Sequence, residues 1–177
     1  MCIMILCIGV LLMVIHEKNE RFGSMNGYTI DYLTARVEDL IQNLEKEEPN
    51  VDEHKMIIRQ IGMMTGYIKS QNNMSFLNYP TYKYIIRDSK IKDFKSKEAM
   101  TALKKYYETL SWLREDLDEY ENNYEDYNND ISKYRYFRTH REEIDTKFYE
   151  FENLIDGYNQ NERNREEIKT ILDELCD

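Results

Sequence analysis

The sequence is short of the residues that interrupt helices or form tight turns. It holds 2 prolines and 6 glycines among 177 residues. The turn-forming pairs Asn26-Gly27 and Asp156-Gly157 lie beside helical periodicities and not between alternating strand patterns, so they do not indicate β-hairpins. We therefore expect an all-α protein, built as a helical bundle or as a long antiparallel helical hairpin with further helices packed on it.

Residues that commonly carry chemistry are also scarce. Cys2 and Cys7 lie in an apolar leader and Cys176 lies at the other end, which is no disulfide framework. Neither His54 nor His140 has a carboxylate three residues before it, as the motif of di-metal bundles requires. The glycine patterns of phosphate and dinucleotide sites and the G-x-S-x-G motif are absent. We expect no enzymatic activity, cofactor or metal.

Basic residues are fewer than acidic ones in this chain, with 24 Lys and Arg, 34 Asp and Glu and a net charge of −10. That balance argues against a nucleic-acid-binding protein, because phosphate contacts need clustered cations. Two basic stretches, 83–105 and 133–141, keep nucleic-acid association as an alternative, since the second interleaves cations with aromatic residues as base-stacking surfaces do. We favour the interpretation in which Tyr134 and Phe137 point into the bundle.

A long apolar run occupies residues 1–15, MCIMILCIGVLLMVI, without a charged side chain. As a helix it is about 22 Å long, short of the ~30 Å hydrocarbon core of a bilayer. We interpret it as a short anchor of a single-pass, membrane-associated protein. A cleaved signal peptide, a true start at Met25 and a helix buried in an oligomer remain open. Lys18 and Arg21 follow the run and favour a cytoplasmic position for the remaining chain.

Beyond the apolar run, the sequence divides into a tether and one domain. Residues 16–27 contain Gly23-Ser24 and Asn26-Gly27 and are expected to be a flexible tether. Residues 28–177 are expected to form a single helical domain. Periodicity predicts helices over 28–47, 52–70, 96–127, 131–155 and 164–175, with Asn50 as the N-cap of the second. Gly62 and Gly66 are interpreted as small residues where another helix crosses.

The central pattern spans Met100 to Tyr158, where apolar and tyrosyl residues recur at spacings of three and four. Its first half includes Met100, Leu103, Tyr107, Leu110, Leu113 and Leu117. The cluster 128–130 predicts a turn that brings an acidic segment against a basic one. Tyrosine is enriched at interfaces, so the tip of this hairpin is the expected partner-binding surface, comprising Tyr120, Tyr124, Tyr127, Tyr134, Tyr136, Arg135 and Arg138.

These patterns favour a non-enzymatic, membrane-tethered structural or adaptor protein that acts through a protein partner or through self-association. A soluble helical regulator or inhibitor that binds one partner protein is the first alternative. A nucleic-acid-associated protein that uses the two basic stretches is the second.

Overall fold

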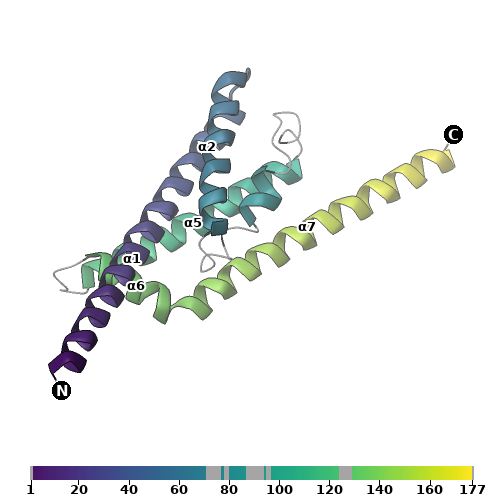
Figure 1. Cartoon of the computed structure of the whole chain (residues 1–177). Coiled ribbons are helices and arrows are strands. Elements are labelled where there is room, and N and C mark those ends of the chain that lie inside the picture. The colour runs from purple at the N-terminus through teal and green to yellow at the C-terminus, as the bar shows by residue number, and fades with distance from the viewer. Residues whose placement is uncertain are drawn as a thin grey trace.

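The computed structural model describes residues 2–70, 77, 80–86, 94, 97–123 and 129–176. Over these residues the chain is helical and contains no strand, which confirms the all-α class. The elements are α1 (Cys2–Leu44), α2 (Val51–Ser70), the π-helix η1 (Tyr82–Ile86), α5 (Lys97–Asn123), α6 (Asn129–Thr139) and α7 (Arg141–Cys176) (Figure 1).

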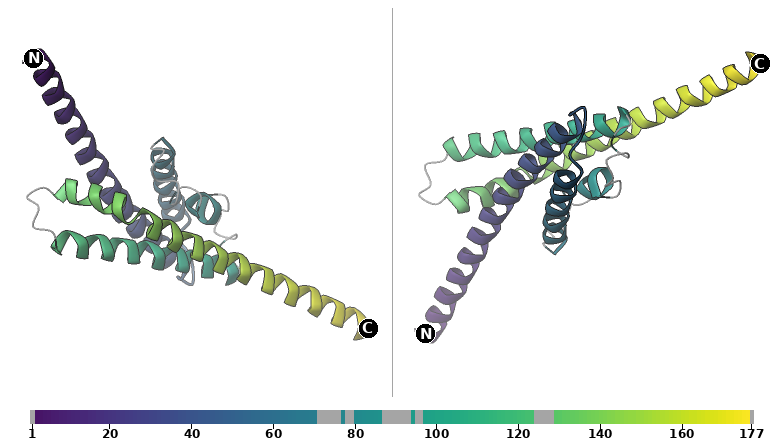
Figure 2. Two further views of the ribbon diagram at one scale, coloured as in Figure 1. Left: turned by 90° about the horizontal axis from the view of Figure 1, so that it is seen from below. Right: turned by 90° about the horizontal axis from the view of Figure 1, so that it is seen from above.

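The helices form a crossed bundle with two projecting ends. α5 lies beside α6 and the first part of α7, so the antiparallel pairing expected for Met100–Tyr158 is present (Figure 2). α1 crosses α5 and α6, and α2 folds back along α1. The N-terminal part of α1 and the C-terminal part of α7 extend out of the bundle in different directions (Figures 1 and 2).

The core draws its buried side chains from α1, α2, η1, α5, α6 and α7. α1 contributes Ile30, Leu33, Val37 and Leu40, none more than 1% exposed. Burying one large aliphatic side chain stabilises the fold by about 1.5–3 kcal/mol, so such a stripe fixes the helix more strongly than helix propensity does. On α5 the buried tyrosine is Tyr106 and not Tyr107, which is only partly buried, so the expected stripe was one residue out of register there.

The connection between α1 and α2 is held by two asparagines. The side-chain oxygen of Asn50 accepts hydrogen bonds from the backbone N–H groups of Asp52 and Glu53, at 3.0 and 3.1 Å, which confirms it as the N-cap. Asn43 is 1% exposed, and its amide donates to the Asn50 carbonyl and accepts from the Asn50 N–H, both at 3.0 Å. The turn therefore satisfies its buried polar groups internally.

The prediction of a flexible tether over residues 16–27 was wrong. This segment is part of α1, which continues without a break from Cys2 to Leu44. Asn26 is 3% exposed and Gly23 and Gly27 are buried, because α6 packs across them. Tertiary contact has overridden the local preference of glycine, serine and asparagine for irregular backbone.

Two further helix boundaries differ from expectation. The helix predicted over 131–155 is divided at His140 into α6 and α7. The Thr139 hydroxyl donates to the Arg135 carbonyl at 2.9 Å, and such side-chain bonds to backbone carbonyls bend helices. The break expected at Gly157 and 159–161 is absent, since α7 runs from Arg141 to Cys176. A glycine costs a helix interior only about 1 kcal/mol relative to alanine, which is too little to end a helix by itself.

Within the described part of the chain, no helix combines the length and the apolar character needed to cross a membrane.

Candidate interaction surfaces

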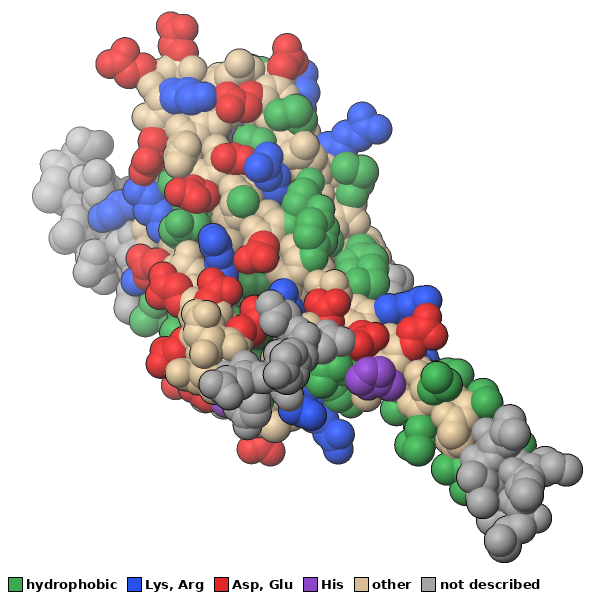
Figure 3. Space-filling view, turned by 90° about the vertical axis from the view of Figure 1, so that its left-hand side faces the viewer, with side chains coloured by type: hydrophobic (Ala, Val, Ile, Leu, Met, Phe, Trp, Pro, Cys, Tyr) green, Lys and Arg blue, Asp and Glu red, His purple; other side chains and the backbone are tan. Residues whose placement is uncertain are grey.

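The N-terminal part of α1 projects from the bundle as an apolar arm, which we define as residues 7–15. Its large side chains from Ile8 to Ile15 are 46–74% exposed, and they follow one another on every side of the helix. Figure 3 shows hydrophobic side chains on the visible sides of this projecting segment. The arm ends at a charged turn, where Glu17 pairs with Arg21 at 2.5 Å and His16 lies 3.3 Å from Glu20.

Above the arm, α1 and α6 cross at very close range. A Cβ atom on Gly23 would lie 1.9 Å from the backbone oxygen of Asp130, and one on Gly27 would lie 2.8 Å from Cδ of Lys133. Ser132 is 2% exposed on the buried side of α6. Sequence reasoning missed this crossing although Gly23 and Gly27 have the G-x-x-x-G spacing that permits it.

The crossing expected at the other glycine pair is present only in part. A Cβ on Gly62 would lie 3.7 Å from Cδ1 of Ile86 in η1, which is an ordinary contact. A Cβ on Gly66 would have no neighbour within 4 Å. Gly66 therefore has no packing role in the described structure.

The structure places the predicted hairpin-tip residues in different environments. Tyr136 is 0% exposed, and its hydroxyl donates to the Asp116 carboxylate. The Tyr136 ring stacks on His140 with centroids 4.7 Å apart and meets Tyr120, which is partly buried, edge-on at 5.4 Å. Burial raises the pKa of Tyr136, and the bond to Asp116 adds to the increase. Tyr136 therefore belongs to the core and is not accessible to a partner.

The other tip residues divide between contact and exposure. Tyr134 is partly buried against Phe22 of α1, with ring centroids 5.8 Å apart. Arg135 and Arg138 are exposed on the outer side of α6. Tyr124 and Tyr127 lie outside the described residues. Over the residues that the structure does describe, the tip therefore presents arginines to solvent more than tyrosines.

The expected pairing of acidic and basic segments occurs between α5 and α6. Lys133 lies 3.6 Å from Glu121, and both side chains are less than a quarter exposed. Burial raises the pKa of Glu121, although the charge of Lys133 acts in the opposite direction. Lys133 is therefore directed toward α5, whereas the arginines that follow it are exposed.

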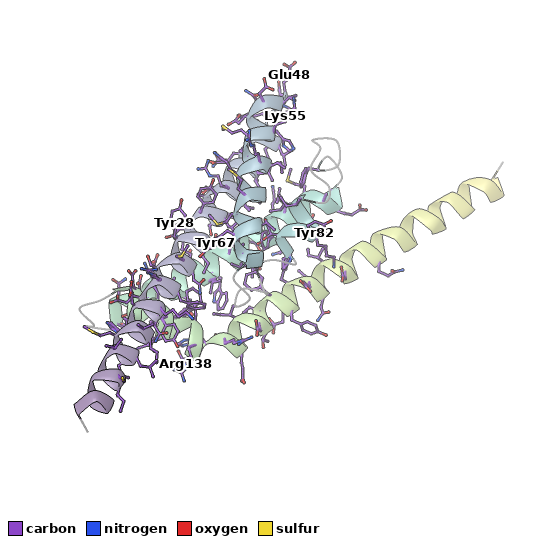
Figure 4. All side chains as sticks on the ribbon, in the orientation of Figure 1. Tyr28, Glu48, Lys55, Tyr67, Tyr82 and Arg138 are labelled. Atoms are coloured by element: carbon purple, nitrogen blue, oxygen red, sulfur yellow. The ribbon has the colours of Figure 1, made fainter. Side chains whose placement is uncertain are left out.

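A shallow groove of about 300 Å³ lies between α1 and α2, and we call it the Met/Tyr groove. It is lined by Met25, Tyr28, Tyr32, Gln60, Met63, Met64 and Tyr67. Tyr28 and Met63 are each 61% exposed, and the Tyr67 hydroxyl lies 3.0 Å from the Met25 sulfur. Figure 4 shows Tyr28 and Tyr67 on neighbouring helices at this groove. Sequence reasoning missed it because Met25 was assigned to the tether.

Two buried hydroxyl groups near the core, those of Tyr106 and Thr81, have hydrogen-bond partners. The Tyr106 hydroxyl is hydrogen-bonded to Thr81, whose own hydroxyl bonds the Leu77 carbonyl, and burial raises the pKa of Tyr106. Among the described residues, no group of three or more His, Cys, Asp or Glu is arranged to hold a metal ion.

Comparison with known proteins found no matching family model, and no curated protein or solved structure matches the chain.

Proposed function

We propose that the protein is a non-enzymatic helical adaptor or scaffold that is tethered to a membrane by the apolar arm and acts through protein–protein contacts. The observation that carries the proposal is the exposure of the arm, whose large side chains from Ile8 to Ile15 are about half exposed or more. Soluble proteins rarely leave contiguous apolar patches of more than a few hundred Å² in water.

Lipid is the environment that suits an apolar surface on all sides of a helix, because a helix resting on a protein surface needs only one apolar face. Residues 2–15 contain no charged side chain. As a helix they measure about 21 Å, which passes the middle of a ~30 Å hydrocarbon core without reaching its far side. The proposal therefore requires insertion into the bilayer and does not require a complete crossing.

The adaptor part of the proposal rests on the Met/Tyr groove. Methionine side chains adapt to differently shaped apolar partners, and tyrosines supply rigid contact area with a polar end. A groove between two helices is the usual site for an apolar face of a third helix. Met25 and Tyr28 of this groove lie on the same continuous helix as the arm, so a docked partner would be held at a fixed distance from the membrane.

Flotation on lipid vesicles tests the tether. We expect the full chain to float with phosphatidylcholine vesicles and a chain beginning at His16 to remain in solution. Leu11→Asp combined with Val14→Asp should also abolish flotation, because charged side chains resist transfer into hydrocarbon. Val51→Asp with Met63→Asp is the matched control, since both side chains are exposed on α2. Full solubility of the monomeric full chain would disprove the tether.

A soluble regulator that binds one partner protein is the second candidate, and the same Met/Tyr groove favours it. A photo-reactive residue at Met63 should crosslink a single partner in cells, whereas one at Gly66, on the same helix but not among the lining residues, should not. With the photo-reactive residue kept at position 63, Tyr28→Lys on the α1 wall of the groove should abolish the crosslink without changing the thermal unfolding temperature. If the full chain crosslinks at Met63 yet never floats with vesicles, the regulator replaces the tethered adaptor.

A further inference from the structure

We propose that the outer side of the α6–α7 bend binds the headgroups of anionic phospholipids. We define the basic collar as Arg135, Arg138 and Arg141, all of which are exposed. The inference rests on the proposed membrane tether, because it concerns the part of the bundle that stands above the inserted arm.

Arg138, the middle residue of the collar, lies on the side of the bundle from which the arm leaves. Figure 4 shows Arg138 on the underside of the α6–α7 bend, and the arm extends from the same side. Seen from below, both the bend and the N-terminal end of α1 are close to the viewer, and seen from above α1 recedes (Figure 2). Phe22, which packs on Tyr134, follows the end of the arm by seven residues, or about 10 Å along the helix axis.

The charge of this segment is opposite to that of the whole chain. Residues 131–141 contain four Lys and Arg and no Asp or Glu, in a protein with a net charge of −10. Lys133 is used inside the bundle against Glu121. Arg141 approaches Asp145 at 3.7 Å, but the two side chains are 68% and 49% exposed, and such a pair is weak in water. The collar therefore places three exposed guanidinium groups at the surface of the bundle.

The orientation of the aromatic residues favours a membrane over a nucleic acid. Proteins that bind single-stranded nucleic acids combine cations with aromatic side chains on which bases stack. Here Tyr136 is 0% exposed and Phe137 is 8% exposed, and Tyr134 packs against Phe22. The surface offers guanidinium groups without stacking platforms, which suits lipid phosphates that are read by charge alone.

Vesicle composition distinguishes membrane binding by the collar from membrane binding by the arm. Full-length chain is floated with vesicles of pure phosphatidylcholine and with vesicles that contain 30% phosphatidylserine by design, at about 0.1 M salt. Each cation near an anionic surface strengthens binding by about fivefold. We expect the double substitution Arg135→Gln, Arg138→Gln to weaken binding to the anionic vesicles about 25-fold and to leave binding to the neutral vesicles unchanged.

Two matched variants keep the result interpretable. Lys55→Gln with Arg59→Gln removes the same charge from α2, and Figure 4 shows Lys55 at the end of the molecule opposite the arm, so anionic binding should be retained. Arg135→Lys with Arg138→Lys should restore binding to the anionic vesicles. If the glutamine variant fails to fold, the wild-type preference for anionic vesicles must still disappear at about 1 M salt, where the Debye length is about 3 Å.

Three outcomes overturn the assignment. Equal binding of the wild-type chain to neutral and anionic vesicles would show that the collar does not bind anionic headgroups, and would not contradict the tether. Loss of preference in the Lys55, Arg59 variant shows that net charge, and not the collar, is responsible. Tighter binding to a single-stranded oligonucleotide than to anionic vesicles assigns the surface to nucleic acid. Failure to float with either vesicle type contradicts the tether itself and is thereby distinguished from failure of the collar.

Discussion

Substituting the glycines with alanine tests whether α1 and α6 meet as closely as the structure indicates. Gly23, Gly27 and Gly66 all lie within helices, so each alanine gains about 1 kcal/mol of helix propensity. What differs is the surrounding space. A Cβ meets the Asp130 backbone oxygen at 1.9 Å on Gly23, the Lys133 side chain at 2.8 Å on Gly27, and nothing within 4 Å on Gly66.

The expected free energies of unfolding follow from those distances. Gly66→Ala should stabilise the protein by about 0.5–1 kcal/mol, because only propensity changes. Gly27→Ala should be close to neutral, since the end of the Lys133 side chain can rotate away. Gly23→Ala forces the two helices apart, because a backbone atom cannot rotate away. Overpacking costs about 1–3 kcal/mol, so a net loss of up to about 2 kcal/mol is expected.

The assay is urea unfolding followed by far-ultraviolet circular dichroism, with a chain that begins at His16 and so retains the whole crossing. With a slope of about 2 kcal/mol per molar urea, the unfolding midpoints of Gly66→Ala and Gly23→Ala should differ by up to about 1.5 M. The order of stability should be Gly66→Ala, then Gly27→Ala, then Gly23→Ala. If Gly23→Ala is as stable as Gly66→Ala, the close crossing of α1 and α6 is refuted.

Three further changes are expected to have measurable effects. Asn50→Ala should lower the free energy of unfolding by about 1 kcal/mol in the same assay, whereas Asn50→Asp should retain the cap. Because burial raises the pKa of Tyr106 and Tyr136, the native state keeps protons that the unfolded chain loses above about pH 10. Below about pH 10 these two tyrosines should not affect the free energy of unfolding, and above it the free energy should fall by up to about 2.7 kcal/mol per pH unit. Urea unfolding between pH 9 and 11 should show a smaller fall when both tyrosines are replaced by phenylalanine. A chain that begins at Met25 should melt at a lower temperature than one that begins at His16, because it lacks Phe22 and Gly23; equal melting temperatures would argue against their contacts with α6.

Local sequence signals were sufficient to predict a helix where one of its faces is consistently buried. The stripe Ile57, Ile61 and Ile68 is buried to 1% or less, and α2 begins within one residue of its expected start. The cap at Asn50 could also be predicted, because it depends only on residues within one turn. These features are encoded by neighbours in the sequence.

The errors occurred where a residue's role is set by a distant segment. Gly23 and Asn26 have the composition of a loop, and only the presence of α6 explains why they are helical and buried. Tyr136 has the composition of an interface, yet Asp116 and Tyr120 on α5 enclose it. Spacing alone could not decide between Tyr106 and Tyr107 on α5, because adjacent positions differ by only about 100° around a helix.

The continuity of α1 decides how the arm and the basic collar act together. A flexible tether would let the arm anchor the protein without orienting it, whereas a single helix fixes the α6–α7 bend relative to the arm. Inserting Gly-Pro-Gly after Asn19 would introduce a hinge, because proline interrupts a helix. We expect flotation with neutral vesicles to persist and the preference for anionic vesicles to fall, since the collar would no longer be held at the surface. An unchanged preference would mean that the collar finds the membrane without help from the rigid helix.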